Sequence, residues 1–426
     1  MSKTRAIGRW ALTGLMINTI IGSGIFGVPS ELIRLVGTFS PWVFIISGLV
    51  VAAIVACFAE VASQFSEGGG PYLYVRTAFG RLTGLQIGWF TALAPIAAAA
   101  AQANLFVNYL AGFSSNLGVG ANRALVILAL IGLPLAANGL GARVGKGLSS
   151  LLVIAKLLPI ALLILVGLLH AGRNVPVPTV PAGSAYSAGA WFGAILLGVF
   201  SFGGFEDPLA ATGDVDKPRT SIAFALAMSL LACVLVYTLV QWVVVAALGN
   251  AVSERPLAAA ATVWLGPSGG AFVAVTAMLS TAGSISAILL AAPRILSALA
   301  QNGDAPRLLG RASNTTGAPV VASIAVALVI VALAITGTFP MALALTAGSM
   351  MVMIIGVCAA LPRLRALHPS ADAMRMPFGR VLAAICIGVS IVLLLQLNAR
   401  EAALIAVTAF AAVLNWLLVR NRAQSS

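Results

Sequence analysis

The segment IIGSGIF at residues 20–26 decides the architecture of this chain. It interrupts an apolar stretch, residues 10–33, that is long enough to cross a lipid bilayer as a helix. Glycine weakens a helix, and a break inside a membrane leaves backbone N–H and C=O groups that need new partners. We therefore predict a helix that is broken at Gly22, Ser23 and Gly24.

A second segment of the same kind, FSFGGFEDP at residues 200–208, interrupts the apolar stretch 188–212. Its two glycines weaken the helix, and Asp207 followed by Pro208 is typical of residues that begin a new one. Two interrupted spans at corresponding positions of two halves are typical of transporters built from inverted repeats, whose site lies where the repeats meet. The alternative is that these glycines only allow close packing of helices.

The composition indicates that the chain lies in a membrane. Of its 426 residues, 60% are hydrophobic and 8% are charged, and the mean hydropathy is +1.05. These values exclude a soluble enzyme, a disordered chain and a secreted disulfide scaffold, because a soluble protein needs far more polar surface. The net charge of +13 is spread along the chain, so we expect no nucleic-acid partner.

Twelve apolar stretches are long enough for membrane helices, so we expect an all-α integral membrane protein. They cover residues 10–33, 40–59, 83–112, 123–141, 147–170, 188–212, 221–249, 268–300, 318–336, 340–361, 381–399 and 402–419. If both termini are cytoplasmic, 18 of the 24 basic residues fall in cytoplasmic loops and 5 in outer loops. This asymmetry predicts a multi-pass protein of the cell (inner) membrane with cytoplasmic termini.

A broken helix offers chemistry that suits an amino acid. Backbone N–H groups are open at the start of its second half, and carbonyl groups are open at the end of its first half. The carboxylate of a zwitterion accepts hydrogen bonds from the N–H groups, and its ammonium group donates to the carbonyls. Such a site binds the amino and carboxylate groups that α-amino acids share, while other helices contact the side chain.

Several motifs resemble the amino acid–polyamine–organocation family of permeases. The most specific are the two broken segments, IIGSGIFGVP from residue 20 and SFGGFEDPLAATGDVDKPR from residue 201. The others are GGGPYLYVRTAFG from residue 68, NGLGARVGK from residue 138 and ALAQNGDAPRLLGR from residue 298.

This resemblance implies one transmembrane transporter domain over residues 1–426. Its expected parts are a first repeat of five helices at residues 10–170 and an inverted second repeat at 188–362, in which helices one and six are broken. Two extra helices follow at residues 381–419.

The resemblance also implies the substrate site. The amides for the substrate carboxylate belong to Gly22, Ser23, Gly24 and Ile25. The carbonyls for the amino group belong to Ile20, Phe200 and Gly203. The ring of Phe200 is implied as a gate over the substrate, with simple core packing as the alternative.

The expected pocket walls have no acidic or amide side chain. They are Phe202, Ile96, Ala97 and Ile288. An apolar wall favours neutral amino acids, because an unpaired charge is costly to bury.

Lys156 is the only lysine within a predicted span. The resemblance places it beside the first helix break, where sodium-coupled relatives of this fold hold a sodium ion. Its ammonium group would bond a carbonyl of the first helix and Ser284, so we expect no sodium site. The interpretations left open are a proton-coupling group, a permanently charged pin and a side chain that reaches the interface.

Glu206 follows the second break. The resemblance implies a coupling role for it, as a link between the substrate site and the cytoplasmic half or as a proton-responsive carboxylate. The alternative is an acidic residue that only stabilises the N-terminus of a half-helix.

The remaining reactive side chains do not predict a cofactor. The four cysteines lie in apolar stretches without metal-ligand spacing and are interpreted as inert core thiols: Cys57, Cys233, Cys358 and Cys386. With only two histidines and no catalytic motif, we expect no metal, no cofactor and no enzymatic reaction.

Together these features predict a sodium-independent secondary active transporter of amino acids, with neutral ones favoured, that works by alternating access. Its partners would be the amino acid substrate, the lipid bilayer and, in one mechanism, protons. Proton symport and amino acid exchange both remain open. The alternative class is a membrane sensor or intramembrane enzyme without transport.

Overall fold

The computed structural model describes residues 8–22, 24–65, 70–139, 146–171, 186–205, 218–313, 317–367 and 375–419. Within these ranges the chain forms helices and no strand. The first half contains α1 (Arg9–Ile20), α2 (Gly24–Val36), η1 (Gly37–Phe39), α3 (Ser40–Ala62), α4 (Gly70–Phe79), α5 (Arg81–Leu110), η2 (Ser115–Gly118), α6 (Gly120–Gly139) and α7 (Lys146–Ala171). The second half contains α8 (Ala188–Ser201), α9 (Pro218–Leu248), α10 (Pro256–Gln301), η4 (Arg307–Gly310), α11 (Val320–Thr336), α12 (Phe339–Leu367), α13 (Gly379–Leu394) and α14 (Ala399–Val419).

Each of the twelve apolar stretches overlaps at least one of these helices. Two α-helical parts were not predicted. The short helix α4 lies between Gly70 and Gly80, whose positive φ values of 55° and 91° suit glycine. The long helix α10 has a kink at Gly266 (φ 73°), and the ten residues before this kink extend it beyond the predicted span.

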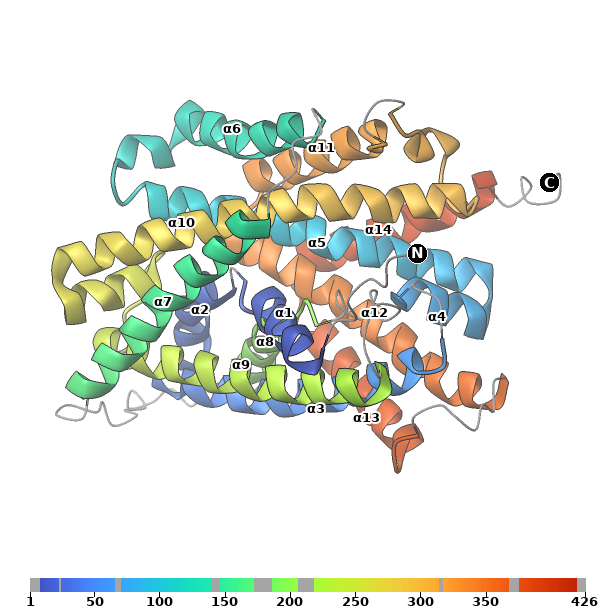
Figure 1. Cartoon of the computed structure of the whole chain (residues 1–426), viewed down its shortest axis with the longest axis horizontal. Coiled ribbons are helices and arrows are strands. Elements are labelled where there is room, and N and C mark those ends of the chain that lie inside the picture. Colours follow the sequence, from blue (N-terminus) through green and yellow to red (C-terminus); the bar gives the residue numbers. More distant parts are fainter. Residues whose placement is uncertain are drawn as a thin grey trace.

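The broken helices lie in the middle of the molecule. Figure 1 shows α1, α2 and α8 between α3 and α9 on one side and α5 and α10 on the other. The helix contacts agree, since α1 packs on α9, α2 on α8, and α3 on both α8 and α9. Segments that are far apart in the sequence therefore surround both helix breaks.

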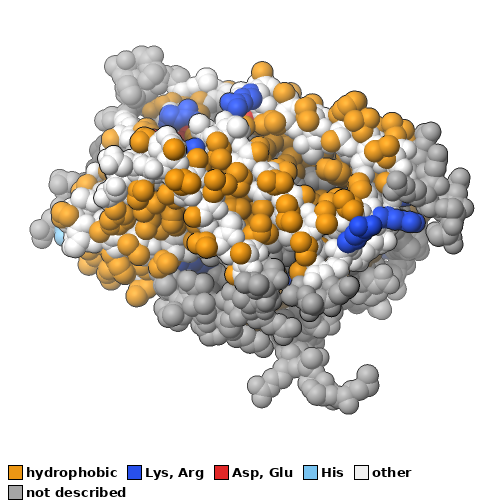
Figure 2. Space-filling view, turned by 90° about the horizontal axis from the view of Figure 1, so that it is seen from above, with side chains coloured by type: hydrophobic (Ala, Val, Ile, Leu, Met, Phe, Trp, Pro, Cys, Tyr) orange, Lys and Arg blue, Asp and Glu red, His pale blue; other side chains and the backbone are white. Residues whose placement is uncertain are grey.

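The exterior is that of a helical membrane protein. Seven helical stretches of the described residues are long and apolar enough to cross a membrane, and four shorter helices are also apolar. Leu49, Leu133, Leu169 and Leu418 lie on four different helices, and each is 70% or more exposed. Hydrophobic side chains are spread widely over the described part of the face in Figure 2, where basic side chains gather at only a few places. Such a surface suits lipid rather than water.

A buried carboxylate links α4 and α5 to the end of α10. Asp304, just after α10, is fully buried and pairs with Arg81 at the start of α5 (2.5 Å) and with Arg76 on α4 (3.0 Å). Tyr72 also donates a hydrogen bond to Asp304. Burial of its hydroxyl, and then the Asp304 carboxylate, raise the pKa of Tyr72 to about 12, so it stays a donor at neutral pH.

Candidate functional site

The first break separates α1, which ends at Ile20, from α2, which begins at Gly24. The chain turns sharply there, because the Gly22 N–H donates to the Ile20 carbonyl at 2.8 Å. Ser23, which was predicted to bind the carboxylate, lies outside the described residues. The N-terminus of α2 then presents the N–H groups that no turn of its own helix can satisfy.

The ammonium group of Lys156 on α7 lies at the C-terminal end of α1, beside carbonyl oxygens of the break. Its Nζ lies 2.7 Å from the Asn18 carbonyl oxygen and 2.7 Å from the Ile21 carbonyl oxygen. The ammonium group therefore satisfies two backbone acceptors that the break leaves without helical partners. Among the described residues no hydrogen bond joins Lys156 to Ser284, although both line the cavity described below.

The second break follows α8, which ends at Ser201. The Gly203 N–H donates to the Phe200 carbonyl at 2.9 Å, which closes the last turn. Gly204 has a φ of 96°, and a Cβ there would lie only 3.0 Å from the Thr19 carbonyl oxygen. A glycine at this position thus allows the end of α8 to approach the end of α1 closely. Glu206 lies outside the described residues.

Tyr237 on α9 connects the two breaks. Its buried hydroxyl lies 2.7 Å from the Ile20 carbonyl oxygen and 2.9 Å from the Ser201 carbonyl oxygen. This residue was not predicted from the sequence. The available signal was a tyrosine hydroxyl in a mostly apolar helix, which needs a partner when it is buried.

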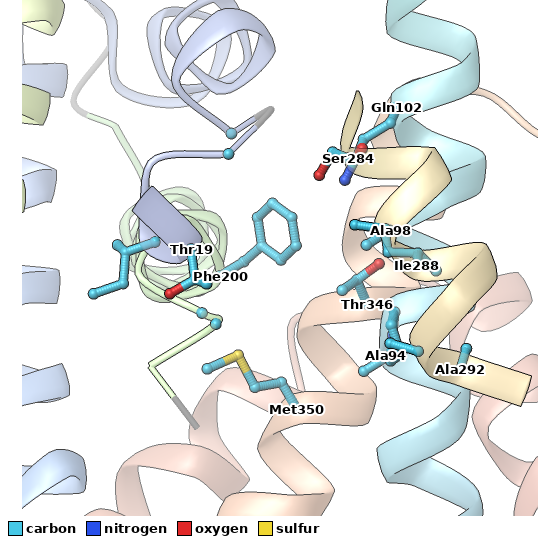
Figure 3. Close-up of a pocket in the computed structure, with 18 of the residues that line it drawn as sticks. Thr19, Ala94, Ala98, Gln102, Phe200, Ser284, Ile288, Ala292, Thr346 and Met350 are labelled. Carbon is cyan, nitrogen blue, oxygen red and sulfur yellow. The ribbon is translucent and has the colours of Figure 1, made fainter. Parts of the chain in front are cut away.

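Both breaks open onto one cavity of about 420 Å³. Helices α5, α10 and α12 form the opposite wall. Figure 3 shows the Phe200 ring pointing from the broken-helix side into this space, with Gln102 and Ser284 near each other across it and Met350 on α12 below. No acidic side chain lines the cavity among the described residues.

Most of the predicted site residues meet at this cavity. Those that line it are Ile20, Gly22, Gly24, Lys156, Phe200, Gly203, Ser284 and Ile288. Four others do not line it and are buried elsewhere in the core: Ile25, Ile96, Ala97 and Phe202. The Phe202 ring instead packs against Phe44 and Tyr237, with ring centroids 6.2 Å and 5.2 Å apart.

The face of α5 that lines the cavity is not the predicted one, as if the helix were rotated about its axis. Its lining residues are Thr91, Ala94, Pro95, Ala98 and Gln102. These positions recur every three or four residues and so share one helical face, whereas Ile96 and Ala97 point away from it.

The cavity wall includes polar groups that were not predicted from the sequence. Gln102 is 5% exposed, and its Oε1 has no hydrogen-bond partner among the described residues. Thr346 on α12 donates its hydroxyl proton to the Ala342 carbonyl, which leaves its oxygen able to accept. A ligand with a donor group could satisfy the Gln102 oxygen.

The chemistry of the site therefore suits a small dipolar molecule. The α2 N-terminus favours a negative group, and the carbonyl groups at the ends of α1 and α8 favour a positive one. The far wall supplies apolar surface and a few neutral polar groups.

Comparison with known proteins gives a consistent result. The model of the amino acid permease family matches residues 7–419 of this chain. The serine/threonine exchanger SteT of Bacillus subtilis is 27% identical over 303 residues, which cover 70% of this chain and 68% of SteT.

Two further relatives are matched over a smaller share of their own length. The branched-chain amino acid permease BcaP of Bacillus subtilis is 26% identical over 261 residues, or 56% of this chain and 54% of BcaP. The large neutral amino acids transporter small subunit 2 of Oryctolagus cuniculus is 26% identical over 330 residues, or 72% of this chain and 59% of its own length.

Proposed function

The chain belongs to the amino acid permease family, and from this premise we propose that it is a sodium-independent secondary active transporter of neutral amino acids. The family and the relatives are transporters, so amino acid transport, not an enzymatic reaction, is its activity. The observation that carries the finer proposal is the cavity that both helix breaks share.

The substrate carboxylate binds at the N-terminus of α2, near Gly22, Gly24 and the neighbouring Ser23. The support is physical: unpaired N–H groups and the positive end of the helix dipole converge there. The amino group binds among the carbonyls of Ile20, Phe200 and Gly203, at the ends of α1 and α8. A carbonyl oxygen has two lone pairs, so Ile20 can accept from both Tyr237 and a substrate.

The side chain of the substrate is neutral. A cationic side chain would find no carboxylate on the described cavity wall, and Lys156 would repel it. An anionic side chain would find no arginine there, and the ammonium group of Lys156 is already held by two carbonyls. The names of SteT, BcaP and the large neutral amino acids transporter also refer to neutral amino acids, which favours the same class.

Coupling does not require sodium in this proposal. The ammonium group of Lys156 donates to the carbonyls of Asn18 and Ile21, and a cation placed beside it would be repelled strongly in an apolar interior. Lys156 then acts in one of two ways: as a proton-coupling group in symport, or as a fixed pin in amino acid exchange. Glu206 is a second candidate for coupling.

The architecture proposed for alternating access has twelve spans and cytoplasmic termini in the cell membrane. Residues 10–170 and 188–362 form the two inverted repeats, and residues 381–419 form the two extra helices. The loop distribution of basic residues supports the orientation. The two broken helices, each first in its repeat, support the repeat boundaries.

A competition experiment tests the substrate class. We expect excess unlabelled neutral amino acids to suppress uptake of a labelled neutral amino acid into proteoliposomes, while arginine, glutamate and a decarboxylated amine do not. The amine lacks the carboxylate that the α2 N-terminus is proposed to bind. Strong competition by arginine or by the amine would contradict the proposal.

A further inference from the structure

Three of the four cysteines converge in the folded chain. Cys57 on α3, Cys358 on α12 and Cys386 on α13 place their sulfur atoms within 4.8 Å of one another. All three are buried, with exposed fractions of 1%, 0% and 2%. From the sequence they were predicted to be inert thiols, because their spacing along the chain gives no sign that they meet. We call them the thiol cluster.

The geometry of the thiol cluster is close to that of a three-sulfur metal site. A metal about 2.3 Å from each sulfur, as in Zn–thiolate bonds, sets the sulfurs of a planar trigonal site about 4 Å apart. The observed spacing of up to 4.8 Å needs only a small contraction to reach this value. Three helices deliver the sulfurs, so the site is built by the fold and not by a flexible loop.

We propose that the thiol cluster binds a monovalent, thiophilic metal ion, Cu(I). Soft thiolate ligands select Cu(I), whereas structural zinc sites take four ligands. Among the described residues, no fourth Cys, His, Asp or Glu joins this group. The nearest acidic side chain on α3, Glu60, is held by Arg365 at 2.5 and 2.8 Å and by the Met376 N–H at 3.0 Å.

Binding at the thiol cluster is coupled to proton release. The thiolate, and not the thiol, is the metal ligand, so Cu⁺ displaces the thiol protons of the ligating cysteines to the solution.

The ion has a short route to the cluster. Cys57 lies five residues before the end of α3, Cys358 nine residues before the end of α12, and Cys386 seven residues after the start of α13. At about 1.5 Å per helical residue, the cluster is roughly 7–14 Å from these helix ends. Figure 1 shows α13 beside α12 and α3, and all three helices contact one another.

Copper competition tests this proposal on the purified full-length protein under reducing, oxygen-free conditions. The protein is titrated against the coloured Cu(I)–bicinchoninate complex. We expect the wild type to remove one equivalent of Cu(I), and Cys57→Ser, Cys358→Ser and Cys386→Ser each to weaken binding by about tenfold or more. The matched control is Cys233→Ser, because Cys233 is equally buried but lies outside the cluster. It should bind copper like the wild type.

If a cluster variant fails to fold, two measurements on the wild type and on Cys233→Ser still test the proposal. Ag(I), a redox-inert ion with the same preference for thiols, should raise the unfolding temperature of the wild type and of Cys233→Ser. X-ray absorption of the copper-loaded wild type should report three sulfur neighbours.

Three results would overturn the inference. The wild type could leave all copper with the chelator, or Cys233→Ser could lose binding as the cluster variants do. Mass spectrometry could instead find the unreduced wild type lighter by two hydrogens, with a disulfide inside the cluster in place of a metal site.

Discussion

The Tyr237 hydroxyl shows how one side chain can serve two helix breaks. It lies within hydrogen-bond distance of carbonyl oxygens at the ends of both α1 and α8. A phenol has one proton, so at any moment it donates to only one of the two carbonyls. When the proton goes to the Ser201 carbonyl, the Ile20 carbonyl is open to the ammonium group of the proposed substrate.

Gly24 gives a test of carboxylate binding at the scale of one residue. A Cβ at this position would lie 3.4 Å from the Cα and Oγ of Ser201, so a methyl group just fits and the larger valine does not. We expect Gly24→Val to displace the α2 N-terminus from its ligand. Loss of a charge-assisted hydrogen bond, about 1.5–3 kcal/mol, weakens binding by about tenfold to a hundredfold. Substrate affinity in proteoliposomes or detergent measures this.

The matched control is Gly14→Val on α1, because a Cβ at Gly14 meets nothing within 4 Å. It should leave both expression and substrate affinity near the wild-type values. Normal affinity in Gly24→Val would show that the carboxylate binds elsewhere.

Individual wall residues were harder to predict than the breaks. The glycine-rich breaks carry a local signal, since glycine weakens a helix wherever it lies. Gln102 and Tyr237 matter because they face distant segments of the chain. No spacing along the sequence predicts such an arrangement. Buried polar groups in apolar helices are nevertheless a usable signal, because each needs a partner.

At the scale of the element, the helix ends agree closely with the predicted breaks. The structure ends α1 at Ile20 and begins α2 at Gly24, and it ends α8 at Ser201. The rotation of α5 could not be predicted in the same way. This helix is apolar almost all round, so its sequence carries no periodicity that selects the face toward the cavity.

Asp304 allows a prediction about how helices are held together. Its carboxylate pairs with Arg76 and Arg81, which links α4, α5 and the end of α10. We expect Asp304→Asn to lower the unfolding temperature by several degrees and to reduce transport, because the arginines lose a fully buried partner. Thermal unfolding in detergent and uptake in proteoliposomes measure the two effects.

Glu31→Gln is the control for a lost ion pair. Glu31 pairs with Arg34 within α2, and the Arg34 side chain is 54% exposed. Exposed pairs contribute little, so stability should hardly change. An Asp304→Asn protein as stable and active as the wild type would contradict the role given to this cluster.

At the scale of the whole molecule, composition alone predicted a helical membrane protein. The apolar exterior in Figure 2 and the long apolar helices agree with it. Cytoplasmic termini and the two inverted repeats remain predictions from charge and from the paired breaks. The convergence of Cys57, Cys358 and Cys386 was beyond reach of the sequence, because it depends on how three distant helices pack.

The two coupling mechanisms differ in what drives accumulation. An inward proton gradient should drive uptake into empty vesicles only in symport, whereas exchange needs amino acid inside. Lys156→Ala should abolish proton-driven accumulation in symport. In exchange it should change only the rate or apparent affinity, because α1 loses its anchor.

The most direct test of the proposed sodium-independent mechanism is the sodium dependence of neutral amino acid uptake into proteoliposomes. External sodium is replaced by potassium at constant ionic strength and constant pH, with amino acid inside the vesicles. Because Lys156 already occupies carbonyls of the first break, we expect the same saturable uptake with and without sodium. Uptake that rises steeply with external sodium would contradict the role of Lys156 and, with it, the proposed mechanism.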